Sequence, residues 1–309
     1  MNQAPNNRWL HRYAIFVAFA TFLLIIAGAL VTSNDAGLSV PDWPTSFGSF
    51  RMPRMVGGVK FEHGHRMIAA FVGLLTVFLA AWLWVSEPRR WVRRLGGLAV
   101  LAVIAQAALG GLTVLLYLPV PISVGHACLA QIFFCIAVSL ALFTRPGFRW
   151  EPAKIIEDPR SPSLRKLAAG TTAAIFSQLI LGAAFRHNGF GILPHVIVAG
   201  LVTLGVLWVS ARVLADFRHE RRLVRSAALL TGLLFIQIFL GIASYMTKLA
   251  ARGAPQPLPG VVAVTTTHVA VGALVLAASL VVALEAYRVL GAPARAIQIA
   301  PASECVVGL

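Results

Sequence analysis

Four histidines recur near the starts of apolar segments, in every second segment along the chain: His65, His126, His195 and His268. Neutral imidazole is a common metal ligand, and two imidazoles on facing helices suit the two axial positions of a haem iron. A closed zinc or copper site usually needs three or four nearby ligands. A single histidine of this kind could equally be a hydrogen-bonded packing residue, but the recurrence favours metal binding. The pattern therefore predicts two bis-histidine haem sites.

The first of these histidines lies in a cluster of ionisable residues, FEHGHRMIAAF (61–71). Ionisable side chains are costly at the edge of a hydrocarbon-length segment. If a helix begins before Glu62, this carboxylate lies one turn from His65 on the same face, where it could accept protons from a bound substrate. The alternative is a glutamate that favours the helix N-terminus and pairs with Arg66.

The second pair of histidines lacks this carboxylate, since Ile192 and Val196 occupy the positions that match Glu62 and Arg66. This asymmetry predicts one site for chemistry and another for electron transfer or structure.

The other four histidines are weaker candidates. His11 and His219 lie among basic residues, where solvated side chains are expected, and His63 points about 160° away from His65 around a helix. His187 belongs to a turn, with no role assigned.

Eight apolar segments must position these residues. The chain is 58% hydrophobic and 12% charged, and a membrane-spanning helix needs about 20 apolar residues. The expected spans are 12–32, 65–85, 96–117, 122–144, 168–186, 194–215, 226–247 and 263–287. Because the segments are continuous rather than alternating, a β-barrel is excluded. The fold class is an all-α integral membrane protein of eight transmembrane helices.

The net charge of +15 follows alternate connections rather than one patch: 19 of the 26 basic residues lie in the tails and the 2–3, 4–5 and 6–7 connections. This bias places both termini in the cytoplasm and the four histidines near the outer face. It argues against nucleic acid as a partner.

The two halves of the chain resemble each other. GALVTSNDAGL (28–38) matches GAAFRHNGFGI (182–192), and QAALG (106–110), QLILG (178–182) and QIFLG (237–241) each place Gln four residues before Gly. Two pseudo-twofold-related four-helix bundles are expected, in residues 1–150 and 164–309, joined by a cytoplasmic linker (151–163). The glycines either allow close helix packing or make room for a flat cofactor.

The first outer connection (34–61) is long and contains SVPDWPTSFGSF (39–50). Long ordered loops are often functional lids. Cations on this charge-poor side either bind haem propionates or are ordinary interfacial anchors: Arg66, Arg186, Lys248 and Arg252. Cys128 and Cys135 are expected to be packing residues.

GALVTSNDAGLSVPDWP (28–44), EHGHRMIA (62–69) and the later histidines resemble the haem A synthase family over nearly the whole chain. The resemblance implies that the methyl group at C8 of haem O is oxidised to a formyl group through an alcohol, giving haem A for terminal oxidases in the cell membrane. It also implies that His65 and His126 flank the substrate haem and that Glu62 is essential. His195 and His268 would ligate a haem b in the C-terminal half.

Haem O synthase and cytochrome oxidase assembly factors are the partners that the resemblance suggests, with the oligomeric state left open. Some members carry a cysteine pair in the first outer connection, which this chain lacks. The alternative function is a di-haem membrane cytochrome that relays electrons.

Overall fold

The computed structural model describes residues 7–148, 156–158 and 160–290, and these residues form eight helices. The helices are α1 (Arg8–Ser33), α2 (Val59–Ser86), α3 (Arg90–Leu115), α4 (Val120–Phe143), α5 (Leu164–Arg186), α6 (Ile192–Asp216), α7 (Arg221–Ala250) and α8 (Pro259–Val289). All eight are long and apolar enough to cross a membrane, and the described residues include no strand, only two isolated bridges. The predicted fold class is confirmed. Each helix begins two to six residues before its predicted start.

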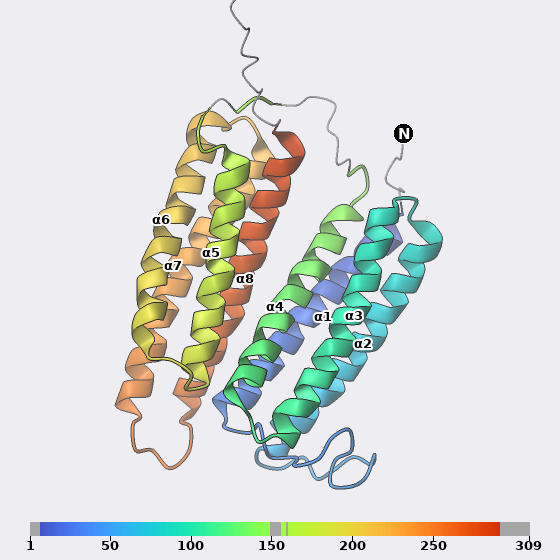
Figure 1. Cartoon of the computed structure of the whole chain (residues 1–309), viewed down its shortest axis with the longest axis vertical. Coiled ribbons are helices and arrows are strands. Elements are labelled where there is room, and N and C mark those ends of the chain that lie inside the picture. The colour runs from blue at the N-terminus through green and yellow to red at the C-terminus, as the bar shows by residue number, and fades with distance from the viewer. Residues whose placement is uncertain (1–6, 149–155, 159, 291–309) are drawn as a thin grey trace, which may run out of the picture.

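The helices form two groups of four, α1–α4 and α5–α8, which Figure 1 shows side by side. Within the first group α1 packs on α2 and α4, and α3 packs on α2 and α4. The second group repeats this order, with α5 on α6 and α8, and α7 on α6 and α8. The two groups share the same pattern of helix–helix contacts, in agreement with the duplication. The pseudo-twofold axis stays a prediction.

Helix α8 connects the two groups. It packs on α5 and α7 of its own group and on α1 and α4 of the other. Each group has its own apolar core, and a smaller cluster between them joins Ile25 and Phe134 to Ala273 and Ala277. Residues of α8 therefore belong to the structure of both groups.

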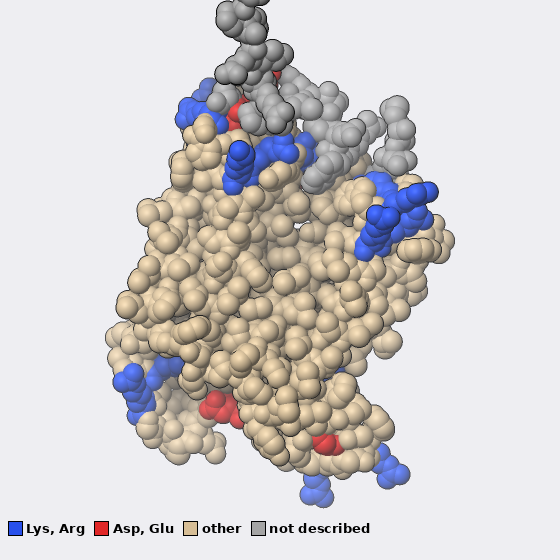
Figure 2. All heavy atoms as spheres, viewed as in Figure 1, with Lys and Arg blue, Asp and Glu red and all other residues tan. Residues whose placement is uncertain are grey.

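The two ends of the helices differ. We call the end with the α2–α3, α4–α5 and α6–α7 connections the basic end, and the opposite end the histidine end. Figure 2 shows Lys and Arg mainly at the basic end, above a broad band without charged residues. Two buried ion pairs fix connections at the basic end: Arg89 with Glu87, 2.7 Å apart, and Arg212 with Asp158, 2.9 Å apart.

The linker predicted at 151–163 lies partly outside the described residues. Within the described part, Asp158 also accepts a hydrogen bond from the first backbone N–H of α5, at Leu164 (2.5 Å). Cys128 and Cys135 are free thiols within α4, and Cys305 lies outside the described residues.

Candidate functional site

Each of the four predicted histidines lies against a glycine of the preceding helix. A Cβ atom placed on Gly28, Gly110, Gly182 or Gly241 would lie 3.1, 3.2, 2.9 and 3.1 Å from Cε1 of His65, His126, His195 and His268 respectively. Such contacts are shorter than nearly all real Cβ contacts. The space left by the glycines is therefore filled by imidazole, so neither of the two sequence-based interpretations fully describes their role.

The same four imidazoles share an unsatisfied atom. Nδ1 is buried in each of them and has no hydrogen-bond partner among the described residues. Buried polar atoms are paired in the great majority of cases, so an unpaired atom needs an explanation. Its recurrence at four equivalent places indicates sites built around a further group.

The second pair of histidines is held at close range. The ring centroids of His195 and His268 are 6.5 Å apart. Gln178 donates from Nε2 to the carbonyl oxygen of His195 (2.8 Å), and this Nε2 lies 3.3 Å from the ring Nε2. Gln237 approaches Nε2 of His268 in the same way, at 3.4 Å. The glutamines four residues before the glycines thus contact the histidines, a role that the sequence pattern alone did not reveal.

The first pair lies beneath the long connection between α1 and α2. His65 and His126 interact electrostatically. The indole of Trp43 covers Gly111, next to the glycine that contacts His126: a Cβ on Gly111 would lie 2.7 Å from the indole. The connection therefore covers the histidine end of α3, as the lid prediction requires, and Trp43 is its contact residue.

Glu62 is buried, with 4% of its surface exposed, in a hydrogen-bonded pair with Arg66. Its Oε1 accepts from Arg66 Nη2 (2.6 Å) and its Oε2 accepts from the backbone N–H of Val40 (2.8 Å). Because α2 begins at Val59, Glu62 and His65 lie one turn apart on one helix. Both carboxylate oxygens of Glu62 thus bind groups that hold the α1–α2 connection. This arrangement contains the pairing with Arg66 that the sequence offered as the alternative role of Glu62.

Arg66 binds the same connection through its guanidinium group. Its guanidinium donates to the carbonyl oxygens of Val40 (2.9 Å), Asp42 (2.7 Å) and Thr45 (3.1 Å). Both terminal nitrogens are therefore engaged by the chain, which leaves only Nε of Arg66 for the predicted contact with a haem propionate.

The turn at the tip of the connection is closed by Asp42. Its carboxylate accepts hydrogen bonds from the Thr45 hydroxyl and from the backbone of Phe47 and Gly48. These bonds, that of Thr45 first, lower the pKa of Asp42 to about 2. The Ser46 hydroxyl lies 2.9 Å from Nδ1 of His63. His63 therefore contacts the connection and is not part of the predicted histidine pair.

Arg186 links the two groups of helices at the histidine end. From α5 it donates to the carbonyl oxygen of Ala29 (3.0 Å) and the hydroxyl of Ser33 (2.7 Å), both on α1. Lys248 and Arg186 both interact electrostatically with Asp35. The adjacent His187 is half-buried, and burial first and then the charge of Arg186 lower its pKa. His187 interacts with His126 across the groups, a proximity that the sequence did not predict.

The donor set of each pair, two imidazoles, suits a haem iron, and the separation of His195 and His268 allows one. Metal–imidazole bonds are about 2 Å long, so rings 6.5 Å apart leave room for one iron between them. No group of three or more His, Cys, Asp or Glu side chains comes together in the described parts of the chain. Each histidine pair would supply two imidazoles to a metal ion. Fold and site define a multi-pass membrane protein with a pair of histidines at the same end of each four-helix group.

The comparisons with known proteins agree with this class. The COX15-CtaA family model, described as "Cytochrome oxidase assembly protein", matches residues 59–194. Proteins named heme A synthase are 23% identical in Lysinibacillus sphaericus over 79% of this chain and 88% of the relative, and 27% identical in Shouchella clausii over 76% of each. One from Symbiobacterium thermophilum is 31% identical over 54% of this chain and 56% of the relative. These matches agree with the resemblance found in the sequence: the chain is similar to proteins named heme A synthase.

Proposed function

We propose that this protein is a haem A synthase, which oxidises the C8 methyl group of haem O to a formyl group through an alcohol. The observation that carries the proposal is the asymmetry of two otherwise similar sites. Both have a histidine pair on glycines, but only the first has a buried carboxylate one turn away and a folded connection above it. The names of the relatives support the same activity.

In this proposal His65 and His126 hold the substrate haem in the N-terminal half, while His195 and His268 hold a haem b in the C-terminal half. The haem supplies the redox chemistry. The contribution of the chain at the first site is to orient the substrate between two imidazoles, exclude water with the Trp43 connection, and handle protons at Glu62.

Glu62 can accept a proton only if its ion pair with Arg66 opens, or if a proton moves within the pair. Oxidation of the methyl group and then of its alcohol removes two electrons at each step, which an electron acceptor must take, and releases protons that need an acceptor near the edge of the ring. The Oε2 atom of Glu62 is held by the backbone N–H of Val40, so movement of the connection would free this oxygen. Movement of the lid and acceptance of a proton would therefore both depend on the carboxylate of Glu62.

The cations have separate roles in the proposal. Arg186 and Lys248 approach the space between the two sites and share an interaction with Asp35, which suits contacts with propionates. Arg66 contributes mainly through the connection that it binds. Haem O synthase and oxidase assembly factors are the proposed partners, and the four-helix halves are the proposed domains.

The experiment is pigment extraction from cells that make haem O, with and without this protein. We expect haem A to appear only with the protein. A di-haem electron carrier is the second candidate, and the similar construction of the two histidine pairs favours it. Bound haem without any haem A, in cells shown to contain haem O, would establish the second candidate instead.

A further inference from the structure

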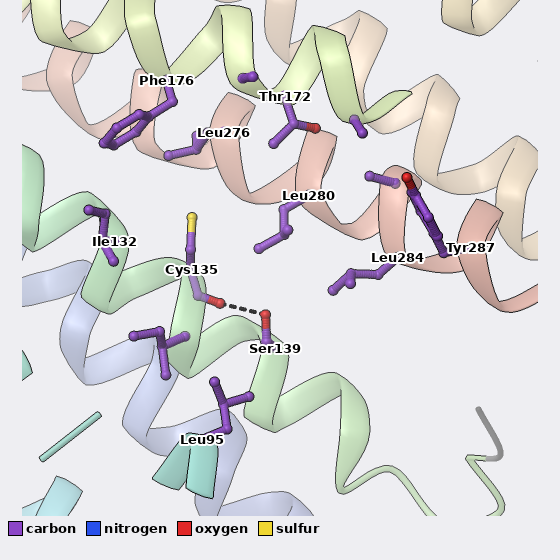
Figure 3. A pocket seen from close by; sticks show the side chains of 14 residues that line it. Leu95, Ile132, Cys135, Ser139, Thr172, Phe176, Leu276, Leu280, Leu284 and Tyr287 are labelled. Carbon is purple, nitrogen blue, oxygen red and sulfur yellow. Dashed lines mark hydrogen bonds between the residues drawn. The ribbon is translucent and has the colours of Figure 1, made fainter. Parts of the chain in front are cut away.

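A groove separates the two groups of helices on the side of the molecule shown in Figure 3. It has a volume of about 510 Å³ and lies between α4, α5 and α8, in the half of these helices nearer the basic end. Its walls include Ile132 and Cys135 of α4, Phe176 of α5, and Leu280 and Leu284 of α8. The groove begins about two helical turns from the histidine pairs, since Ile132 is six residues after His126 and Leu276 is eight after His268, and it extends from there toward the basic end.

Hydrocarbon is the chemistry that the walls accept. The lining is almost wholly apolar, and the hydroxyl groups of Ser139 and Thr172 already have partners. Ser139 donates to the carbonyl oxygen of Cys135 (2.8 Å; Figure 3). Thr172 donates to the carbonyl oxygen of Ala168 (2.9 Å) and lies 2.7 Å from the hydroxyl of Ser279. A polar head group would find no free partner on these hydroxyls, whereas an alkyl chain needs none.

A cation lies at the basic end of the groove. Arg165 is four residues before Ala169, which lines the groove, so it lies on the same face of α5 one turn further toward that end. Its guanidinium carbon is 4.4 Å from the ring centroid of Tyr287, another lining residue. Among the described residues, Arg165 forms no salt bridge with an acidic side chain. The groove therefore ends at an amphipathic tyrosine and a cation not neutralised by a described carboxylate.

The surroundings add positive charge. Arg145 and Arg288 both approach Glu285, at 3.6 and 2.7 Å. Burial first, and then the nearby charge of Arg222, lower the pKa of Arg145. Two cations thus contact Glu285, beside the end of the groove, and a third, Arg222, lies close to Arg145. A ligand with an anionic head and a hydrocarbon chain is complementary to this arrangement, and basic pockets between membrane helices recognise such lipids.

We propose that the groove between α4, α5 and α8 is a binding site for an anionic phospholipid, with an acyl chain against Phe176 and Leu280 and the phosphate at Arg165. The bound lipid fills the space between the two helix groups where their side chains do not meet. This site is independent of the haem chemistry proposed above, and its test does not require activity.

The test uses the full chain in nanodiscs made of equal amounts of dioleoylphosphatidylglycerol and dioleoylphosphatidylcholine. Native mass spectrometry then measures which lipids stay bound after release. We expect phosphatidylglycerol to be enriched about fivefold, since one cation near the membrane surface contributes about that factor. Arg165→Gln should return the ratio to that of the bulk lipid. Lys166→Gln, which removes the exposed neighbouring cation, should keep the enrichment.

A second pair of variants tests the chain-binding part without changing charge. Ala173 is an exposed alanine that lines the groove, and Ala173→Phe fills it. Ala211→Phe adds the same ring at an exposed alanine of α6, outside the groove. We expect only Ala173→Phe to lower the retention of both lipids, severalfold.

Three results would overturn the proposal. One is a bound ratio equal to the bulk ratio in the unchanged protein, which means adventitious annular lipid only. Another is an equal effect of Arg165→Gln and Lys166→Gln, which means a general basic surface. The third is displacement of an isoprenoid quinone, rather than phospholipid, by Ala173→Phe. If Arg165→Gln does not fold, the Ala173 and Ala211 variants decide the proposal by themselves.

Discussion

The imidazole of His195 rests on the backbone of Gly182, so closely that a methyl group there would lie 2.9 Å from the ring carbon Cε1. The same relationship joins the other three histidines to their glycines. Position and orientation of each candidate ligand are thus set by a residue without a side chain on the neighbouring helix. This relationship gives a direct structural test of the haem sites.

Gly182→Ala should displace His195 and weaken haem binding in the C-terminal half. We expect a loss of about 10–100-fold in haem affinity, the range typical when a contact that orients a metal ligand is removed. The measurement is the low-spin absorption spectrum of the purified protein. Gly170→Ala is the control, because it makes the same change in α5 where a Cβ meets nothing within 4 Å. Equal spectra for both variants would contradict a ligand role for His195.

Replacing the histidines themselves should separate the two sites. His195→Ala or His268→Ala should abolish or broaden the low-spin spectrum of the bound haem b. His65→Ala or His126→Ala should stop haem A formation while that spectrum remains, because the two pairs lie in different four-helix groups. Full haem A production by both first-half variants would require the roles of the halves to be exchanged.

Glu62→Gln should reduce haem A formation by about 10²–10⁴-fold, the usual contribution of general acid–base catalysis. The amide keeps the shape of the side chain but removes its charge, so haem b content should stay near normal while haem O or its alcohol accumulates. Extracted haems are quantified by chromatography.

The contacts of Glu62 with Arg66 and Val40 require a control for the structure of the connection. Protease cleavage within residues 34–58 reports this structure. If Glu62→Gln increases cleavage as much as Arg66→Gln does, the loss of turnover reflects anchoring of the connection and not proton transfer. Unchanged cleavage with lost turnover supports the catalytic role.

Trp43→Ala should lower haem A formation without affecting the haem of the C-terminal half. The indole covers Gly111 beside the His126 contact, so its loss opens the first site to water. Phe50→Ala is the matched control, since Phe50 belongs to the same connection but is 85% exposed. Equal activity of Trp43→Ala and Phe50→Ala would show that the connection does not act as a lid.

Arg186→Gln should destabilise the contact between the two helix groups. It removes charged hydrogen bonds to Ala29 and Ser33, and such bonds contribute about 1.5–3 kcal/mol each. Thermal unfolding of haem-depleted protein measures this effect, with Lys248→Gln for comparison. A shift that appears only when haem is bound would assign Arg186 to propionate binding instead.

The sequence predicted the helices well because membrane-spanning segments follow from local composition. The eight apolar segments became α1–α8, and the charge of the connections predicted a basic end. The starts were less accurate: α3 begins at Arg90 rather than residue 96, because the helix includes the arginines that end the apolar pattern. Helix α2 likewise begins before its predicted start, at Val59, and this places Glu62 inside the helix.

The parts that could not be predicted depend on tertiary contacts. Nothing in the composition of residues 34–58 indicates that Trp43 covers Gly111 or that Ser46 meets His63. Arg186 was expected among cations on the outer side, but its bonds to α1 depend on how the two groups pack, which the duplication does not specify. The histidines were found because the duplication repeats them, whereas their glycine contacts required two neighbouring helices to be seen together.

Helix α8 packs on α5 and α7 of its own group and on α1 and α4 of the other, and it carries His268. Chains are made from the N-terminus, so His65 and His126 are both present once α4 has entered the membrane. The second pair and the contacts of α8 with α1 and α4 must wait for the last helix to leave the ribosome, whereas the bonds of Arg186 to α1 need only α5. One late insertion event therefore completes both the second histidine pair and the packing between the two groups, and the N-terminal pair exists earlier without either.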